Sequence, residues 1–226
     1  MTARRYPPRS SALYDPATEM PRPVVGLDID GTLGEYHLHF LRFAEGWFGS
    51  PMPGVSIYKG EKYDGKLPLY RWMGVSKARY RQCKMAYRRG GLKRSMPVRE
   101  GAAELSRAVR AAGATVIICT TRPFLMLENV DPDTQEWLRR NRIQYDGILH
   151  GEHKYRDLAR AYGNRIVMVL EDIPELLTQA QENACHPVLI RRPHNSGYAS
   201  EFAVYDLQGA QEVALRRIAD YEKRNR

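Results

Sequence analysis

The chain has 226 residues, of which 43% are hydrophobic and 27% are charged, and this is the composition of an ordinary globular protein. Its length suits one core domain with a modest insertion. No apolar run reaches the roughly 18 residues that a transmembrane helix needs, so we expect no membrane partner. The cysteines Cys83, Cys119 and Cys185 show no CxxC spacing, which disfavours a disulfide framework or a zinc site and favours a cytoplasmic location.

The net charge of +9 is concentrated in one segment. Residues 1–33 carry four basic and four acidic side chains, and residues 97–226 carry eighteen of each. Residues 34–96 carry thirteen basic and four acidic side chains, so the whole excess lies there. A localised positive field attracts phosphorylated or polyanionic ligands, and a merely soluble basic surface is the simpler alternative.

The predicted elements begin after an N-terminal arm. Residues 1–22 are rich in proline, serine and arginine and contain no apolar stretch, so we expect a flexible arm rather than a secretory signal. Val24–Asp28 (VVGLD) is a short apolar run that ends in polar residues, which is typical of a buried strand.

Residues 34–96, called here the cap segment, hold aromatic clusters and stretches rich in glycine and proline (GSPMPG, YKGEKYDG). We expect them to form an inserted cap of mainly helices. Ser76 can cap a helix that runs to Arg89 and stops at Gly90-Gly91. A basic stripe recurs along this helix at steps of four, three and four: Lys77, Arg81, Lys84 and Arg88.

After the cap segment, apolar strands and helices alternate. The predicted strands are residues 114–119 (ATVIIC), 147–149, 165–170 (RIVMVL) and 187–190, the last core strand, and the predicted helices are residues 100–113, 133–141, 154–162, 174–184 and 207–223. Such alternation is typical of a parallel sheet with helices on both faces. We therefore expect a Rossmann-like α/β core built from residues 23–33 and 97–226, with the small helical cap inserted after the first strand.

Polar segments follow the predicted strands or begin a helix, and four of them can converge on one rim of the sheet. They are Asp28-Ile29-Asp30-Gly31-Thr32, Thr120-Thr121-Arg122-Pro123, Lys154, and Glu171-Asp172. Their order and spacing resemble the signature of phosphatases of the haloacid dehalogenase (HAD) superfamily, over roughly residues 23–33 and 97–195. The resemblance implies a phosphomonoester hydrolase.

The resemblance also implies a role for each catalytic residue. Asp28 would attack phosphorus and form an aspartyl-phosphate. Asp30 would protonate the leaving oxygen and then deprotonate the hydrolytic water. Thr120 would bind the transferring phosphoryl group through its hydroxyl, and Lys154 would neutralise charge on the nucleophile and the phosphoryl oxygens.

A magnesium ion is the implied cofactor. It would lie between the Asp28 carboxylate, the backbone carbonyl of Asp30 and Asp172, with Glu171 in an outer position. Elementary electrostatics agrees, because two like charges about 4 Å apart repel by about 4 kcal/mol at an effective dielectric near 20. A hard dication together with Lys154 would offset that repulsion when a phosphate dianion approaches.

The position of the insertion resembles the 5'(3')-deoxyribonucleotidase branch of the superfamily. The segments GGLKRSMPVREGA, ICTTRP and VLIRRPHN resemble that branch as well. The implied substrate is a phosphorylated small molecule, most simply a nucleotide, with Thr121 and Arg122 beside its phosphate. Arg122 is equally a candidate for a structural role. A nucleobase needs an aromatic slot, for which the candidates are Trp47, Phe48, Tyr70 and Trp72, unless these form the small core of the cap.

Other functions stay open at this point. A polynucleotide 3'-phosphatase would use the same core and could bind nucleic acid along the basic stripe. A non-catalytic nucleic-acid-binding module with a relict HAD core is the alternative from another class. His37 and His39 suggest a metal site, but without a third nearby ligand they are better interpreted as ordinary cap residues. The oligomeric state is left open.

Overall fold

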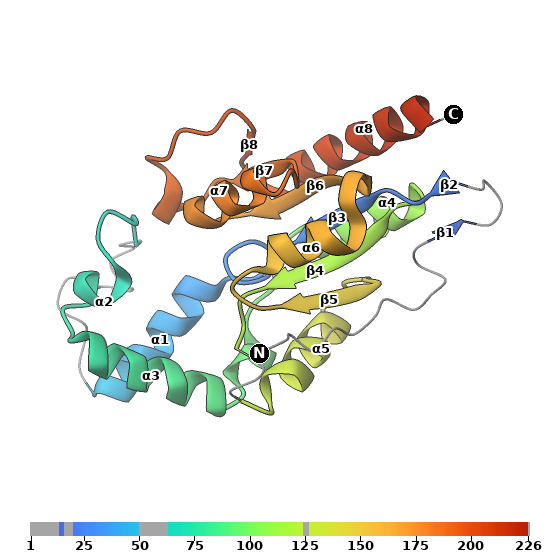
Figure 1. Ribbon diagram of the computed structural model, residues 1–226. Helices are drawn as coiled ribbons and strands as arrows, with labels where there is room; N and C mark the ends of the chain where they lie inside the picture. The colour runs from blue at the N-terminus through green and yellow to red at the C-terminus, as the bar shows by residue number, and fades with distance from the viewer. Residues whose placement is uncertain (1–13, 16–19, 50–62, 124–126, 226) are drawn as a thin grey trace.

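The structure is a computed structural model that describes residues 14–15, 20–49, 63–123 and 127–225. Its centre is a six-stranded parallel sheet in the order β5-β4-β3-β6-β7-β8, with helices on both faces (Figure 1). The strands are β3 (Val24–Leu27), β4 (Thr115–Thr120), β5 (Gly147–His150), β6 (Ile166–Glu171), β7 (Pro187–Ile190) and β8 (Ala203–Val204). The predicted Rossmann-like α/β core is therefore confirmed.

Two apolar layers form because successive side chains of a strand point to opposite faces of the sheet. In β4, Val116 and Ile118 join the larger core cluster, whereas Ile117 and Cys119 join the smaller one. The larger cluster is covered by α4 (Ala102–Ala111), α5 (Val130–Arg140) and α8 (Leu207–Asn225), and the smaller by α6 (Lys154–Tyr162) and α7 (Pro174–Glu182). These helices agree with the predicted ones to within three residues at either end. No helix in the described part of the chain is long and apolar enough to cross a membrane.

The edge of the sheet holds one strand that the sequence did not predict. β7 coincides with the predicted range, but the expectation that it is the last core strand is wrong, because β8 pairs with it in parallel. The N–H of Leu189 donates to the carbonyl of Phe202 at 2.9 Å, and that of Arg191 to the carbonyl of Val204 at 2.7 Å. A strand of two residues is too short to show a hydrophobic period.

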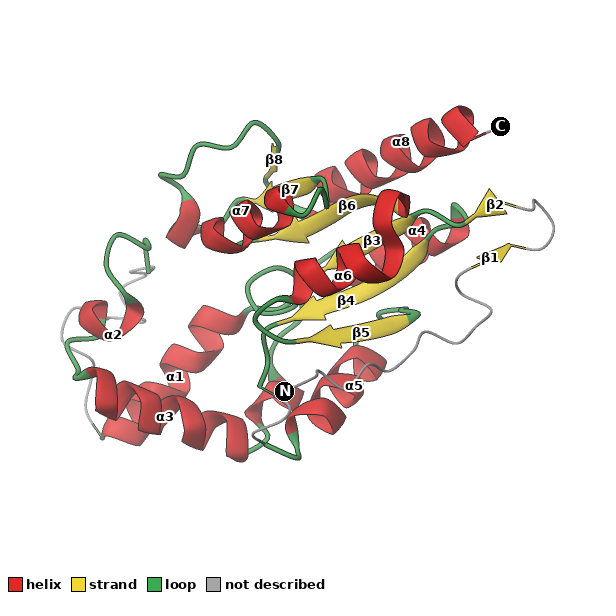
Figure 2. Cartoon of the chain, in the orientation of Figure 1, coloured by secondary structure: helices red, strands yellow, loops and turns green. Residues whose placement is uncertain are grey.

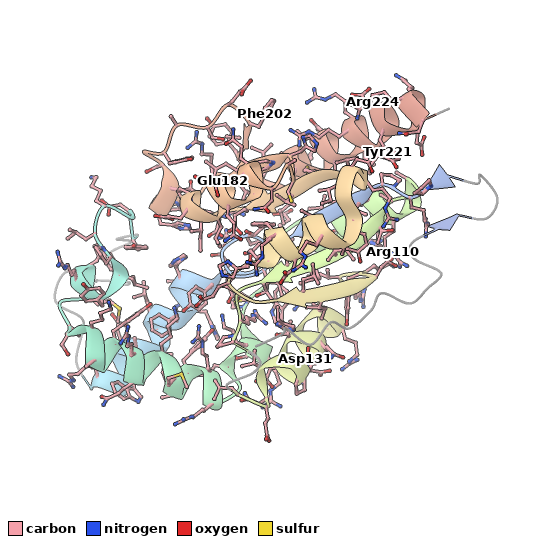
Figure 3. The ribbon with its side chains drawn as sticks, viewed as in Figure 1. Arg110, Asp131, Glu182, Phe202, Tyr221 and Arg224 are labelled. Carbon is pink, nitrogen blue, oxygen red and sulfur yellow. The ribbon has the colours of Figure 1, made fainter. Side chains whose placement is uncertain are left out.

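Part of the predicted N-terminal arm has regular structure. β1 (Tyr14–Asp15) pairs antiparallel with β2 (Met20–Pro21). Tyr221, on α8 in Figure 3, donates its hydroxyl to the carbonyl of Pro21 at 3.1 Å, which ties the end of this pair to the core. The rest of the predicted flexible arm, residues 1–13 and 16–19, lies outside the described residues.

The described residues of the cap segment are mainly helical, as predicted, with loops between the helices (Figure 2). The elements are α1 (Tyr36–Phe48), α2 (Leu69–Trp72), α3 (Lys77–Arg89) and the short 3-10 helix η3 (Leu92–Ser95). The Ser76 hydroxyl accepts from the N–H of Arg79 at 3.3 Å and so caps α3, which ends at Gly90 as expected. These helices lie beyond the carboxyl ends of the central strands (Figure 1).

Candidate active site

The carboxyl ends of three neighbouring strands bring the predicted residues to one edge of the sheet. β3 lies between β4 and β6, and Asp28 extends it by donating its N–H to the carbonyl of Leu170 at 3.1 Å. Thr120 ends β4, Glu171 ends β6, and Asp172 directly follows β6. All four of these predicted site residues are buried. The expected convergence of the strand-end segments is thus what the structure shows.

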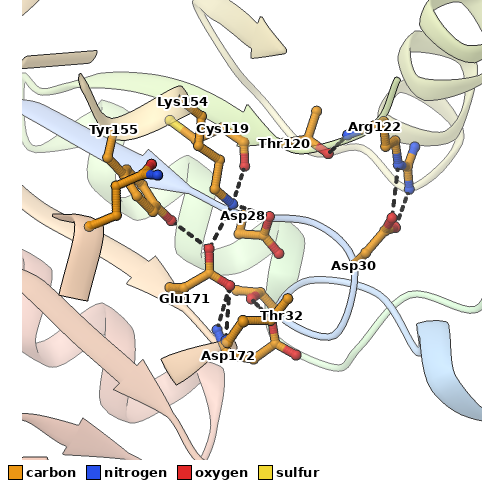
Figure 4. A network of polar contacts seen from close by, with 12 residues as sticks. Asp28, Asp30, Thr32, Cys119, Thr120, Arg122, Lys154, Tyr155, Glu171 and Asp172 are labelled. Atoms are coloured by element: carbon orange, nitrogen blue, oxygen red, sulfur yellow. Dashed lines mark hydrogen bonds and ion pairs between the residues drawn. The ribbon is translucent and has the colours of Figure 1, made fainter. Parts of the chain in front are cut away.

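Lys154 joins the carboxylates of this edge from the first turn of α6. Its Nζ lies 2.6 Å from Asp28 Oδ1 and 2.6 Å from Glu171 Oε2, and it donates to the carbonyl of Cys119 at 3.1 Å (Figure 4). The side chain is completely buried. Lys154 is therefore no solvated surface lysine, because its ammonium lies between two buried acids.

Glu171 and Asp172 differ in what their oxygens contact. Glu171 Oε2 accepts from the hydroxyl of Tyr155 at 2.7 Å, and Oε1 accepts the backbone N–H groups of Asp172 and Ile173 at 2.9 and 3.0 Å. Asp172 Oδ1 accepts from the Thr32 hydroxyl at 3.2 Å, whereas its Oδ2 has no hydrogen-bond partner among the described residues. Both oxygens of Glu171 thus accept hydrogen bonds from the protein, while Asp172 Oδ2 lies 2.8 Å from His194 Nε2. The outer position expected for Glu171 stays a prediction.

The buried acids need more positive charge than Lys154 supplies. One oxygen each of Asp28, Glu171 and Asp172 lies within 4.8 Å of the other two. Burial, and then the charge of the neighbouring carboxylates, raises the pKa of both Asp28 and Glu171. A hard dication such as Mg²⁺ takes oxygen ligands of this kind, so the residues present fit the implied cofactor.

Gly31 allows the loop after β3 to pass close to Asp172. Its φ is +102°, and a Cβ at this position would lie 1.9 Å from Asp172 Oδ2. Both the backbone conformation and the space therefore require glycine here. The Asp-Gly pair does form a turn, with the Gly31 N–H donating to the Gly34 carbonyl at 3.0 Å, but this turn also shapes the acidic site.

Asp30 is held by two cations. Arg122 donates to its Oδ1 from Nη2 at 2.7 Å and to its Oδ2 from Nε at 3.4 Å, and Lys93 donates to Oδ2 as well. Arg122 is buried and also donates to the Thr134 hydroxyl at 2.9 Å. Although burial alone would raise the pKa of Asp30, Arg122 and Lys93 hold it well below its usual range. Asp30 is therefore ionised in this arrangement.

The threonines after β4 have different surroundings. Thr120 is buried, and its hydroxyl accepts from the N–H of Arg122 at 3.3 Å. Thr121 is exposed. Thr120 therefore lies at the site as predicted, while the substrate contact expected of Thr121 stays a prediction.

The aromatic candidates divide into two groups. Trp72 lies edge-on to Tyr63, with ring centroids 5.5 Å apart, and Tyr63 stacks on His194, which lies beside Asp172. Trp47 and Phe48 pack on each other at the far end of α1, roughly 16 Å along the helix axis from its first residue. The structure does not bring these two to the site. Tyr70 contacts Tyr80 within the cap segment.

Several contacts at the site were missed by the sequence analysis. Lys93 lies in the return from the cap segment, where nothing in the residue pattern separates it from the other basic residues. Asn195 donates to the carbonyls of Asp172 and Ile190 at 2.7 and 2.9 Å, and Arg192 donates to the carbonyls of Gly31 and Thr32 at 2.8 and 3.1 Å. These two belong to the segment VLIRRPHN, whose resemblance to a family turn was the available signal.

Comparisons with known proteins give the fold. No protein-family model matches the chain, and no curated protein matches it. A haloacid dehalogenase-like hydrolase from Streptococcus pneumoniae superposes with a TM-score of 0.56 and 14% identity, over 84% of this chain and 97% of that chain. The chain has the HAD-like fold. A predicted phosphatase from Clostridium acetobutylicum gives 0.58 and 14%, over 86% and 99%. A HAD family hydrolase from Deinococcus radiodurans, with phosphate and sodium bound, gives 0.56 and 18%, over 86% and 97%.

The HAD-like match extends beyond the sheet. The predicted core, residues 23–33 and 97–226, makes up 141 of the 226 residues. This is a smaller share of the chain than the 84% that the first structure covers. The likeness therefore includes part of the residues outside the predicted core. At this identity the comparison establishes fold, and the chemistry has to be argued from the site.

Proposed function

We propose that the chain is a magnesium-dependent phosphomonoester hydrolase that acts through an aspartyl-phosphate on Asp28. One observation carries this proposal: the Lys154 ammonium lies 2.6 Å from Asp28 at an edge where oxygens of Asp28, Glu171 and Asp172 lie within 4.8 Å of one another. The names of the matched structures support it, since they include a predicted phosphatase and a hydrolase with bound phosphate.

The reaction has two halves. First, a carboxylate oxygen of Asp28 attacks phosphorus, the bond from phosphorus to the leaving oxygen breaks, and protonated Asp30 gives that oxygen its proton. Next, Asp30 takes a proton from water, the water oxygen attacks phosphorus, and the bond to Asp28 breaks, which releases inorganic phosphate. The ionised Asp30 of the structure suits the second half. For the first half it must exchange its contacts with Arg122 and Lys93 for the leaving group and take up a proton.

The other residues bind and orient. Lys154 neutralises charge that Asp28 and the phosphoryl oxygens share, and the Thr120 hydroxyl binds one phosphoryl oxygen. Asp28, Asp172 and the backbone carbonyl of Asp30 would hold Mg²⁺, with Glu171 behind them. When bound, that ion stabilises the charge of the phosphoryl group and orients it.

The substrate that we favour is a nucleoside monophosphate. The ring contacts from Trp72 through Tyr63 to His194 end beside Asp172, which makes Trp72 the candidate for stacking on a base. This supports the nucleotidase branch that the sequence resembles. Base stacking on an aromatic side chain contributes about 1–3 kcal/mol.

A second candidate substrate is the 3'-phosphorylated end of a nucleic acid. The observation that favours it is the basic stripe on α3, where Lys77 and Arg81 are exposed and Lys84 and Arg88 are partly buried. Lys84 lies close enough to Asp30 to interact with its charge. Burial, and then the neighbouring Arg88, lowers the pKa of Lys84 to about 8. Contacts to several phosphates would make this activity strongly salt-dependent.

A phosphate-release screen tests the proposal. We would compare deoxynucleoside and ribonucleoside 5'- and 3'-monophosphates, 3'-phosphorylated oligonucleotides and sugar phosphates, with Mg²⁺ at two salt concentrations. A preference for mononucleotides that changes little with salt, and that excess chelator reversibly abolishes, is the expected result. Oligonucleotide preference that collapses at higher salt would select the second candidate. No release from any phosphomonoester, together with oligonucleotide binding, would overturn the enzymatic proposal in favour of a binding module.

A further inference from the structure

A second cluster of metal-binding groups also includes Asp172. His37 comes from the first turn of α1, and His194 comes from the short 3-10 helix η5 (Pro193–Asn195) that follows β7. One ligand atom from each of these histidines and one from Asp172 all lie within 4.8 Å of one another. Three elements that are distant in sequence therefore place two imidazoles and one carboxylate at one point.

Two atoms of the cluster are buried without a hydrogen-bond partner among the described residues. They are His194 Nε2 and Asp172 Oδ2. They lie 2.8 Å apart, which is an ion pair when His194 is protonated. The Asp172 side chain is fully buried and that of His194 is 10% exposed. When Nε2 carries no proton, two lone pairs face each other out of reach of water, which is costly unless a cation binds to both.

The surrounding rings hold the two imidazoles in place. The ring centroids of His37 and His194 are 4.4 Å apart, with the planes tilted by 41°. Tyr63 lies against both, 5.5 Å from His37 and 6.3 Å from His194, nearly parallel to the latter. A site whose side chains are fixed by packing loses little freedom when an ion binds.

We propose that His37, Asp172 and His194 bind a first-row transition-metal dication of the Zn²⁺ type. Imidazole nitrogen suits such ions, and two histidines with one carboxylate form a known ligand set for Zn²⁺. This site shares Asp172 with the all-oxygen cluster of Asp28 and Glu171, where Mg²⁺ is expected, and differs from it in its two nitrogen ligands. A bound ion would link α1 of the cap segment to the loop after β7. Ion binding at the histidines does not depend on the proposed phosphatase activity.

The test is a competition titration of Zn²⁺ between a chromophoric chelator and the full chain, prepared without a histidine tag. The wild-type chain is expected to bind one Zn²⁺ more tightly than His37→Ala or His194→Ala by at least 10-fold, and the double variant is expected to lose the site. His153→Ala removes an exposed histidine outside the cluster and should bind like the wild type. Equal Zn²⁺ affinity in the wild type and the double variant would overturn the proposal, as would no binding by the wild type.

A spectroscopic measurement on the wild-type chain tests the same ligands without depending on how the variants fold. Co²⁺ added to the wild-type chain should give visible absorption bands of a low-coordinate site with nitrogen ligands, and Zn²⁺ should abolish them. The weak bands of a six-coordinate, all-oxygen Co²⁺ would instead contradict the histidine ligation. Since neither measurement uses turnover, failure here leaves the proposed phosphatase activity standing, and failure of the phosphate-release screen leaves this site standing.

Discussion

The two carboxylates of the loop after β3, Asp28 and Asp30, are held by different parts of the molecule. Asp28 is held from the core, by Lys154 of α6 at the ends of β3 and β6. Asp30, two residues later, is held by Lys93 from η3 and by Arg122 from the segment after β4. The position of Asp28 thus depends on contacts within the core, whereas that of Asp30 also depends on where the return from the cap segment lies.

The surroundings of Asp28 and those of Asp30 form two halves of the site with opposite charge. On the Asp28 side, Lys154 faces the buried acids Asp28, Glu171 and Asp172, so that side attracts a cation. On the Asp30 side, two cations face one carboxylate, so that side attracts an anion. A phosphate with a bound dication would place a cation beside the acids around Asp28 and an anion beside the cations around Asp30. A metal ion or a phosphate alone would match only one of the two.

The largest expected effect is loss of turnover on changing Asp28. The Asp28→Asn variant should lose roughly 10⁴-fold or more in kcat, because the amide cannot form the aspartyl-phosphate. Phosphate release from the best substrate in the screen measures this, with circular dichroism as the check on folding. Near-normal rates in a folded variant would show that Asp28 is not the nucleophile.

Removing the ammonium group of Lys154 should lower the free energy of unfolding. The Lys154→Met variant leaves Asp28 and Glu171 buried and unpaired, so we expect the free energy of unfolding to fall by about 3–5 kcal/mol. Urea denaturation measures it, and Lys77→Met, at an exposed position of α3, is the control that should stay within about 0.5 kcal/mol. Added Mg²⁺ should restore part of the loss if the site binds it. A loss no larger than that of the control would mean that Lys154 does not balance these acids.

The sequence predicted the surroundings of Asp28 far better than those of Asp30, for a physical reason. Apolar runs that end in Asp28, Thr120 and Glu171 are local patterns, and parallel pairing then places their ends together. The partners of Asp30 are a matter of tertiary contact: Arg122 lies 92 residues away, and Lys93 comes from a segment full of basic residues. No periodicity encodes such a contact, and this is also why His194 was missed.

Removing either of the two cations that contact Asp30, Arg122 and Lys93, should slow catalysis less than changing Asp28. For Arg122→Met we expect kcat to fall by about 10²-fold, which is within the range for general acid–base catalysis, because Asp30 would lose its fixed orientation. For Lys93→Met a smaller loss in the same direction is expected, since Arg122 would still hold the carboxylate. Single-turnover kinetics should show hydrolysis of the aspartyl-phosphate slowed more than its formation, because these cations keep Asp30 ionised for the second half of the reaction. A change confined to KM would instead assign both cations to substrate binding.

The smallest expected effect is a change in KM that distinguishes two tryptophans of the cap segment. Trp72 belongs to the aromatic path that reaches the site, whereas Trp47 packs at the far end of α1. If a nucleobase stacks on Trp72, Trp72→Ala should raise KM for a nucleoside monophosphate by about 5- to 100-fold, which corresponds to about 1–3 kcal/mol. Trp47→Ala is the matched control and should leave KM unchanged. A sugar phosphate without a base should show no difference between the two variants. If both variants raise KM equally for both substrates, the tryptophans stabilise the cap segment, and the base-binding surface must lie elsewhere.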